Sequence, residues 1–226
     1  MLTYRYICFI AVFASCSVLS LLTAQLNLGV GFSAASVYIG ENNDILQEYN
    51  SINQATLEQA YPDLKIMTGV FVSLRYKLER VAFELSWENL ERDINSVLVF
   101  DDKTGQVNNL YYNLTSTSLG VENHIHRFGY GASLASRLFS IKSDIINTDF
   151  KRKIERQREF STKVYLMYTI QKSRLISLQL KPFIQIPLGS YQLSGLQEEL
   201  QSTSAQEKSS SPFLFGLTLV FYNGPH

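Results

Sequence analysis

Cysteine is almost absent from this sequence of 226 residues: Cys8 and Cys16 are the two copies, and both lie within the first 24 residues. Loss of that segment would leave a mature chain without a thiol. Such a chain has no disulfide, no cysteine metal ligand and no cysteine nucleophile.

Net charge is lacking too, because 20 acidic and 20 basic residues cancel. No overall field therefore favours nucleic acid or an acidic partner.

A second long apolar run is also missing, so beyond the N-terminus no segment could span a membrane as a helix. The one such run, Tyr6 to Leu22, follows Arg5 and ends in Leu22-Thr23-Ala24. This arrangement predicts a secretory signal peptide over residues 1–24, cleaved after Ala24. A retained membrane anchor and lipidation at Cys16 are the alternatives. Residues 25–226 contain no stretch that resembles a linker, which predicts a single domain.

What the chain does have is alternation of apolar and polar residues. From Phe160 to Ile170 the even positions are mostly apolar and the odd positions mostly polar, which is typical of a strand with unlike faces. After a polar break at Lys172–Arg174 the pattern resumes at Ile176. The two runs predict a hairpin with a three-residue turn.

We count eight such segments, at about 26–39, 66–77, 81–88, 111–125, 130–138, 160–171, 176–186 and 213–222. Long breaks at 40–63, 89–110, 140–159 and 189–210 alternate with short ones near 78, 126 and 172. Ser51 and Gln54 predict a capping box before a short helix in the first long break. The hairpin tip Asp101–Gly105 predicts that the strands on either side of the second long break extend into it. The Ser-, Gln- and Glu-rich fourth break is predicted to be mobile.

The regular exchange of long and short connections is typical of outer-membrane barrels. The predicted fold class is therefore all-β: an eight-stranded antiparallel up-and-down transmembrane β-barrel with short periplasmic turns and long extracellular loops.

Arg or Lys against lipid would cost about 2–4 kcal/mol, so the charged face of each strand should line the lumen. An eight-stranded lumen is filled by side chains, which predicts a structural polar network and no open pore. The predicted network consists of Arg75, Glu84, Glu88, Glu122, His124, Arg137, Lys163, Gln179 and Lys181. A turn at Leu78 and Glu79 would pair Arg75 with Ala82 and place it diagonal to Glu84.

A basic run in the third long break is the candidate surface site. Its cations are Lys151, Arg152, Lys153, Arg156 and Arg158. Clustered Lys and Arg bind phosphate, so this loop is a possible anion-binding site for surface glycolipid or an acidic partner. A solvated loop, or pairing with the acidic segment 41–63, are the alternatives.

Signatures of catalysis are weak. His124 and His126 have the spacing of a metal pair, but a lumen or turn position explains them as well. Glu84 and Glu88 could form an acid pair, although Arg75 nearby favours a structural role. No phosphate-binding loop and no nucleophile elbow occurs. We therefore expect no catalytic residue, no metal site and no cofactor.

Three stretches carry a resemblance to a known group. With the signal peptide, 26–35 (LNLGVGFSAA), 118–142 (SLGVENHIHRFGYGASLASRLFSIK) and 213–222 (FLFGLTLVFY) resemble the PorT-like family of small outer-membrane barrels, and more broadly OmpX- and OmpA-type barrels. The resemblance implies an outer-membrane location; some PorT-like members are similar to secretion-apparatus components.

The expected function is that of a non-enzymatic outer-membrane barrel, monomeric, with a structural, surface-interaction or secretion-accessory role in the envelope. Its expected partners are outer-membrane lipid and envelope or secretion-complex proteins, and no nucleic acid. The alternatives are a soluble lipocalin-like lipid carrier, whose apolar faces would point inward, and an outer-membrane lipid-modifying enzyme.

Overall fold

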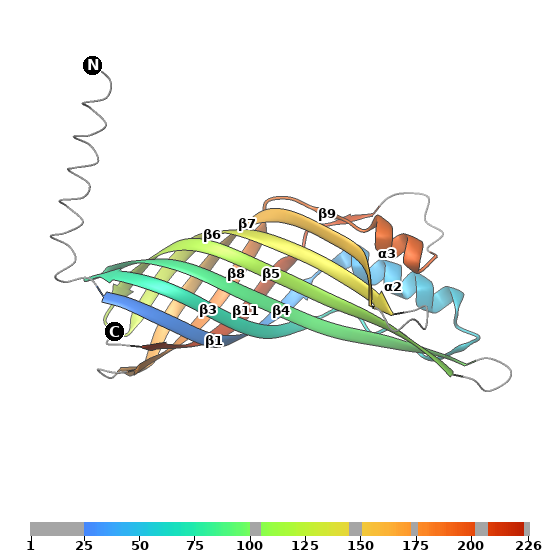
Figure 1. Cartoon of the computed structure of the whole chain (residues 1–226), viewed down its shortest axis with the longest axis horizontal. Helices are drawn as coiled ribbons and strands as arrows, with labels where there is room; N and C mark the ends of the chain where they lie inside the picture. The colour runs from blue at the N-terminus through green and yellow to red at the C-terminus, as the bar shows by residue number, and fades with distance from the viewer. Residues whose placement is uncertain (1–24, 100–104, 145–150, 173–175, 202–207, 224–226) are drawn as a thin grey trace, which may run out of the picture.

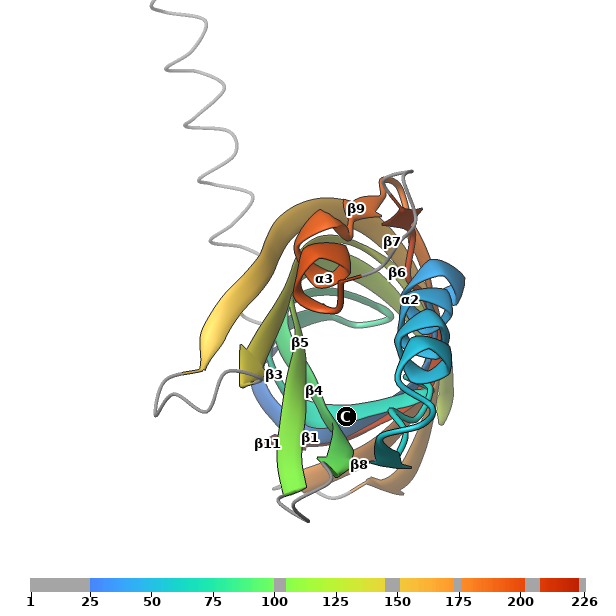
Figure 2. The ribbon, with the colours of Figure 1, turned by 90° about the vertical axis from the view of Figure 1, so that its right-hand side faces the viewer.

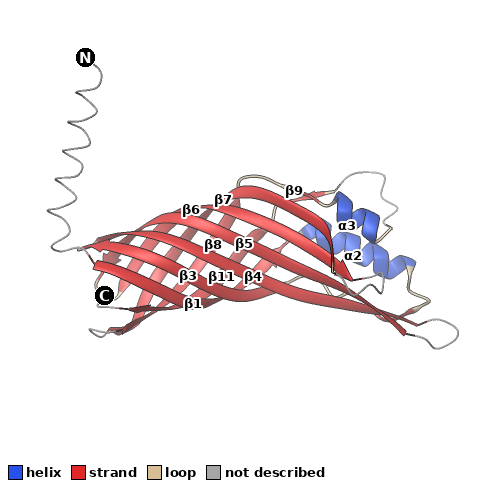
Figure 3. Cartoon of the chain, in the orientation of Figure 1, coloured by secondary structure: helices blue, strands red, loops and turns tan. Residues whose placement is uncertain are grey.

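The computed structural model describes residues 25–99, 105–144, 151–172, 176–201 and 208–223. Within these residues, eight long strands close into an antiparallel barrel (Figures 1 and 3). The strands are β1 (Gln25–Tyr38), β3 (Ile66–Leu78), β4 (Val81–Val99), β5 (Gly105–Ile125), β6 (Phe128–Asp144), β7 (Arg152–Lys172), β8 (Ile176–Pro187) and β11 (Phe213–Asn223). Each pairs with the next along the chain, and β11 pairs back with β1. The predicted fold class is confirmed.

Alternation decides which side chains face in. In β1, Leu28, Val30 and Phe32 are exposed on the outer wall, while the residues between them are buried in the lumen. The same exchange of exposed apolar and buried small or polar positions recurs in the other long strands. At these positions the outer wall is apolar and the interior holds small and polar side chains, which is the reverse of a soluble protein.

The β3–β4 turn differs from the prediction by one residue. Its tip is Glu79–Arg80, with Leu78 paired to Val81, because apolar Leu78 stays in the ladder and the two charged residues take the tip. Glu79 adopts a φ of 42°. As a consequence Arg75 lies directly opposite Glu84 rather than opposite Ala82.

Two of the predicted long breaks are mostly strand. β4 and β5 run through 89–110, as the hairpin prediction for Asp101–Gly105 implied, although 100–104 lie outside the described residues. The break at 140–159 was predicted wrongly, because β6 continues to Asp144 and β7 begins at Arg152. The residues alternate there as well, but charged residues on the outward face hide the pattern.

The remaining long connections build a cap. The first contains α2 (Gly40–Ile52) and β2 (Leu57–Gln59), which pairs with β4. The last contains β9 (Tyr191–Gln192), α3 (Ser194–Glu199) and β10 (Ser209–Ser210). Both helices lie at one mouth of the barrel, opposite the end where β1 begins and β11 ends (Figures 1 and 2). Neither of these two described helices has the length and apolarity needed to cross a membrane.

The helix prediction from Ser51 and Gln54 was wrong. α2 ends at Ile52, and the Ser51 hydroxyl donates a hydrogen bond back to the Glu48 carbonyl at 2.8 Å, inside its last turn. The buried face at Ile45, Leu46 and Tyr49 was the better helical signal. The Ser- and Gln-rich fourth break was predicted to be mobile. Its described part contains β9, α3 and β10, and Leu193, Leu196 and Leu200 are buried there.

The cap and the barrel mouth share one apolar core. Ile45 and Leu46 of α2, and Leu196 of α3, are fully buried in the same cluster as Leu110 and Phe139 of the wall. Polar contacts fix this packing: the Asn108 side chain donates to the Tyr49 hydroxyl, and Tyr112 donates to Asn42, each at 3.1 Å. The Tyr191 ring stacks on Phe139 with centroids 4.9 Å apart. Burial raises the pKa of the Tyr191 phenol to about 12, so it enters this core as a neutral group.

Candidate functional site

The outer wall carries a continuous apolar band. Along β7 its outward positions run from Ile170 to Phe160, a distance of ten residues. At about 3.3 Å per residue and a strand tilt of about 40°, that run is about 25 Å tall, the height of the lipid-facing band of outer-membrane barrels. Other large apolar side chains exposed on the wall include Leu28, Phe32, Val72, Leu74, Leu85, Leu119, Val121, Leu134, Val164, Leu166, Ile184, Phe215 and Leu217.

Aromatic residues border this band. At the turn end Phe128 and Tyr168 lie opposite each other, with ring centroids 5.0 Å apart. At the cap end Tyr38 pairs with Phe213, and both side chains are exposed. Two rows of aromatics at the edges of an apolar band are the girdles expected at the two membrane–water interfaces.

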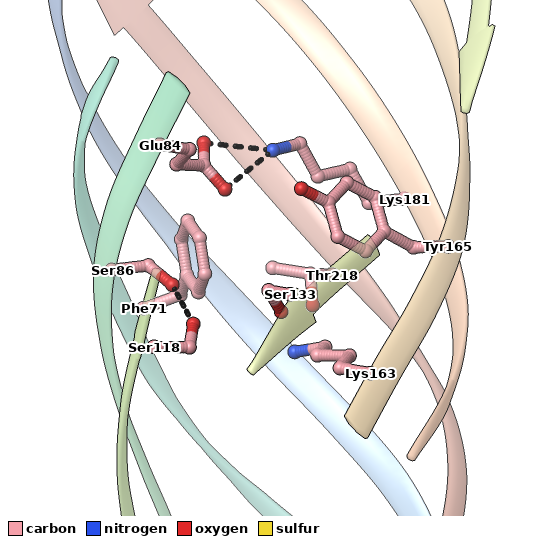
Figure 4. A pocket seen from close by; sticks show the side chains of 9 residues that line it. All are labelled: Phe71, Glu84, Ser86, Ser118, Ser133, Lys163, Tyr165, Lys181 and Thr218. Atoms are coloured by element: carbon pink, nitrogen blue, oxygen red, sulfur yellow. Dashed lines mark hydrogen bonds and ion pairs between the residues drawn. The ribbon is translucent and has the colours of Figure 1, made fainter. Parts of the chain in front are cut away.

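Inside the barrel, Lys181 is shared by two carboxylates. Its Nζ donates to both Glu84 oxygens at 3.0 and 2.9 Å (Figure 4). It also donates to Glu122 Oε1 at 2.7 Å. The Tyr222 hydroxyl also donates to Glu84, and the Tyr165 hydroxyl donates to Glu122. Two neighbouring strands, β4 and β5, are therefore joined through one ammonium group to β8 on the other side of the lumen.

Toward the turn end the network continues through Arg75, which is completely buried. Its Nη1 donates to Gln179 at 3.0 Å and lies 3.7 Å from Glu122 Oε2. The same carboxylate oxygen is 3.1 Å from His124 Nε2. The Arg75 guanidinium also stacks over the Tyr222 ring at 3.7 Å from its centroid, a favourable cation–π distance.

Toward the cap two further ion pairs follow. Lys163 Nζ donates to Glu88 at 2.9 Å, and Ser33 donates to the other Glu88 oxygen at 2.5 Å. Arg137 pairs with Glu159 and donates to the Pro212 carbonyl at 3.0 Å, which fixes the end of the last cap segment against the lumen. At each of these heights in the barrel, a buried cation is therefore paired with a buried carboxylate, because an unpaired buried charge is costly.

Little free space remains between these groups. The gap lined by Phe71, Glu84, Lys163, Tyr165 and Lys181, among others, is about 10 Å³, the room of about one water molecule. Glycine on the lumen face leaves space for a tyrosine ring, because a Cβ at residue 131 would lie 2.6 Å from the Tyr165 ring. At this level of the barrel the described side chains fill the lumen and leave no room for a pore.

All nine residues predicted for the lumen network are buried in the barrel interior, and the ion pairs join most of them. Glu84 and Glu88 do not act as a pair, because each contacts a different lysine. His126 is exposed in the β5–β6 turn, away from His124, and no cluster of metal-ligating side chains occurs in the described ranges.

Sequence reasoning did not select Glu159, Tyr165 or Tyr222. Glu159 and Tyr165 share the alternation phase of Lys163, and Tyr222 shares that of Thr218, so the phase of each strand could have identified them.

The predicted anion-binding loop is not a loop. Arg152, Lys153, Arg156 and Arg158 belong to β7, and Lys151 immediately precedes it. Arg152 turns to the cap, where it forms an ion pair with Glu199 of α3. Within the described residues the acidic segment 41–63 forms no ion pair with this run: Asp63 pairs with Lys65, and Glu48 pairs with Lys208.

A closed eight-stranded barrel with an apolar outer band, aromatic borders and a polar filled lumen defines the class: this chain has the fold of a small outer-membrane β-barrel. No protein-family model matches the chain, and no curated protein matches it in sequence.

Solved structures of similar architecture include Ail of Yersinia pestis, at 10% identity over 87% of this chain and 98% of that chain with a TM-score of 0.47. That structure is a complex of Ail with the heparin analogue sucrose octasulfate. Neisserial surface protein A follows at 7% identity, covering 89% and 98% of the two chains, with a TM-score of 0.46. The outer membrane protein OprG of Pseudomonas aeruginosa matches at 7% identity over 89% and 95%, with a TM-score of 0.39.

Proposed function

We propose that this protein is a non-enzymatic, monomeric outer-membrane barrel with a sealed lumen, which holds its helical cap at the cell surface. One observation carries the proposal: apolar side chains cover the outer wall in a band about 25 Å tall, and at the height of that band the ionic side chains are enclosed in the lumen. Residues 1–24, outside the described part of the chain, are proposed to be the cleaved signal peptide that delivers it.

The alternatives fit this arrangement less well. A lipocalin-like carrier needs an apolar cavity for its lipid, whereas the filled part of this lumen is lined by Glu84, Lys163 and Lys181. A lipid-modifying enzyme needs a nucleophile or acid–base group open to lipid, whereas Glu84, Glu88 and Glu122 are each held by a lysine inside the wall. A PorT-like, secretion-accessory role remains the finer proposal, supported by the three stretches that resemble that family.

Cysteine labelling tests the location and orientation, because the proposed mature chain has no thiol of its own. Ala55→Cys places an exposed thiol in the cap, and Arg80→Cys places one in the β3–β4 turn. On intact cells of a bacterium with an outer membrane, a membrane-impermeant maleimide should label Ala55→Cys, and should label Arg80→Cys only after the outer membrane is permeabilised. The parent chain should stay unlabelled. The reverse pattern, or labelled protein free in the periplasm, would contradict the proposal.

The sealed lumen has its own test. Purified protein refolded into vesicles should conduct no more ions than empty vesicles, while a porin in parallel should conduct freely. Pull-down from crosslinked envelopes would then identify the partner. Steady single-channel conductance from the parent barrel would refute the sealed lumen.

A further inference from the structure

Four exposed cations lie on the outer wall of β6 and β7, directly beyond the apolar band. They are Lys142, Lys153, Arg156 and Arg158, which we call the basic strip. Arg158 and Arg156 occupy the two outward positions of β7 after Phe160, so an aromatic of the outer girdle is followed at once by two guanidinium groups. Lys153 lies opposite Lys142 after a bulge in the ladder.

The height of the basic strip follows from strand geometry. Two residues advance a strand by about 6.7 Å, or about 5 Å along the membrane normal at a tilt of about 40°. Arg158 and Arg156 therefore lie about 5 and 10 Å beyond Phe160. The headgroup layer of one leaflet is about 5–8 Å thick, and long Arg and Lys side chains reach further still. The strip is at the level of lipid headgroups.

Its charge is uncompensated within the described chain. None of its four cations forms an ion pair there, in contrast to Arg152 one residue away, which pairs with Glu199. Lys142 and Lys153 face each other directly, and like charges in that relation destabilise a sheet. The nearest described carboxylate on this face is Asp144, two residues or about 7 Å along β6 from Lys142, and it forms no ion pair with it; Asp93 lies two strands away, or about 10 Å, across Tyr111.

An aromatic platform adjoins the strip. Tyr111 pairs with Lys142, and Lys151 Nζ lies 3.5 Å from the centroid of the Tyr111 ring. Arg guanidinium groups bind phosphate oxygens in pairs of hydrogen bonds, which a lysine cannot match in geometry. Tyr and Phe at this level pack against the sugar or glycerol and the upper acyl chain of a lipid.

We propose that the basic strip is a binding site for the phosphate-bearing headgroups of outer-leaflet lipids, with Arg156 and Arg158 as the principal phosphate ligands. The site rests on the membrane orientation proposed above and adds to it a preferred lipid class. It replaces the predicted anion-binding loop: Arg152 leaves the set because it pairs with Glu199 of the cap, Lys151 leaves it because its ammonium lies over the Tyr111 ring, and Lys142 enters it.

The test uses the mature chain held in detergent micelles and titrated with phosphatidic acid or phosphatidylcholine, with native mass spectrometry counting the bound lipids. Phosphatidic acid should bind more tightly, and Arg156→Gln/Arg158→Gln should weaken it by about fivefold for each cation removed. The matched control is Lys65→Gln/Arg92→Gln, which removes two exposed cations that lie beside acids, and it should bind phosphatidic acid as the parent does. Affinity should fall with added salt.

Three results would overturn the proposal: equal affinity for the two lipids, an unchanged affinity in the strip variant, or an equal loss in the control. Inositol hexakisphosphate distinguishes the source of the phosphate. If it displaces phosphatidic acid from the strip and binds more tightly, the site serves soluble anions and the lipid assignment is wrong. Heat-modifiable migration and a closed lumen should persist in every variant, so failure here is distinct from failure of the sealed-barrel proposal.

Discussion

Replacing Lys181 by methionine removes the cation that two buried carboxylates share. Its contacts with Glu122 at 2.7 Å and Glu84 at 2.9 Å are each worth about 6 kcal/mol at an effective dielectric constant of about 20, before desolvation is subtracted. The net loss on breaking a buried pair is about 3–5 kcal/mol, because the remaining charges stay buried without a partner. We expect a loss of that size in the free energy of unfolding of Lys181→Met.

The assay is urea unfolding from phospholipid vesicles, followed by the fluorescence of Trp87, the one tryptophan, which faces outward. The matched control is Lys65→Met, which breaks the exposed pair with Asp63 and should cost less than about 1 kcal/mol. A second comparison is Lys181→Met/Glu84→Gln. Glu122 then keeps Arg75 and His124, so the double variant should be more stable than Lys181→Met alone.

Two results would refute this reasoning. If Lys181→Met costs no more than Lys65→Met, water reaches the network and the lumen is not sealed. If the losses from Lys181→Met and Glu84→Gln simply add, the two side chains are not coupled. Should Lys181→Met fail to fold, a higher refolding yield for the double variant would still support the coupling.

Three further predictions concern the wall, the lumen and the cap. Leu166→Arg places a cation in the middle of the apolar band and should cost about 2–4 kcal/mol in vesicle unfolding, whereas Gln59→Arg in the exposed β2 should cost about 0–1; equal costs would contradict the membrane orientation. Gly131→Ala brings a Cβ to 2.6 Å from the Tyr165 ring and should cost about 1–3 kcal/mol, while a Cβ at residue 105 meets its nearest atom at 3.9 Å, so Gly105→Ala should be close to neutral in the same measurement. Leu196→Ala opens the fully buried cap core and should cost about 2–5 kcal/mol locally, seen as faster proteolysis of the cap in a barrel that keeps its heat-modifiable migration; Ile52→Ala, at an exposed position, is the control, and equal protease sensitivity would show that α3 does not seal the mouth.

The alternation along each strand was sufficient to predict which charged side chains enter the lumen. Side chains alternate across a strand with a period of two, so the phase of Lys163 or Arg75 is readable without knowing what lies opposite. The cost of charge in lipid then assigns the charged phase to the lumen. The same rule assigned Arg137, although nothing in the sequence connects it to its partner Glu159 or to Pro212.

Where charge falls on the outward phase, the pattern misleads. Arg156 and Arg158 interrupt the apolar phase of β7, so their segment resembled a loop. The helix α2 was misplaced for a related reason: the capping signal at Ser51 is local, whereas Ile45 and Leu46 form a helix face only because the barrel mouth gives them something to pack against.

By itself, the sequence determined the number of long strands, their order and which face of each strand carries charge at the height of the apolar band, since those depend on residues adjacent in the chain. The tertiary structure alone decided that Arg75 lies opposite Glu84, that Lys181 joins Glu84 to Glu122, and that two helices pack at one mouth. The first fact depends on the ladder register that the β3–β4 turn sets, and the other two depend on contacts between residues as far as 169 positions apart, which form only when the ring closes.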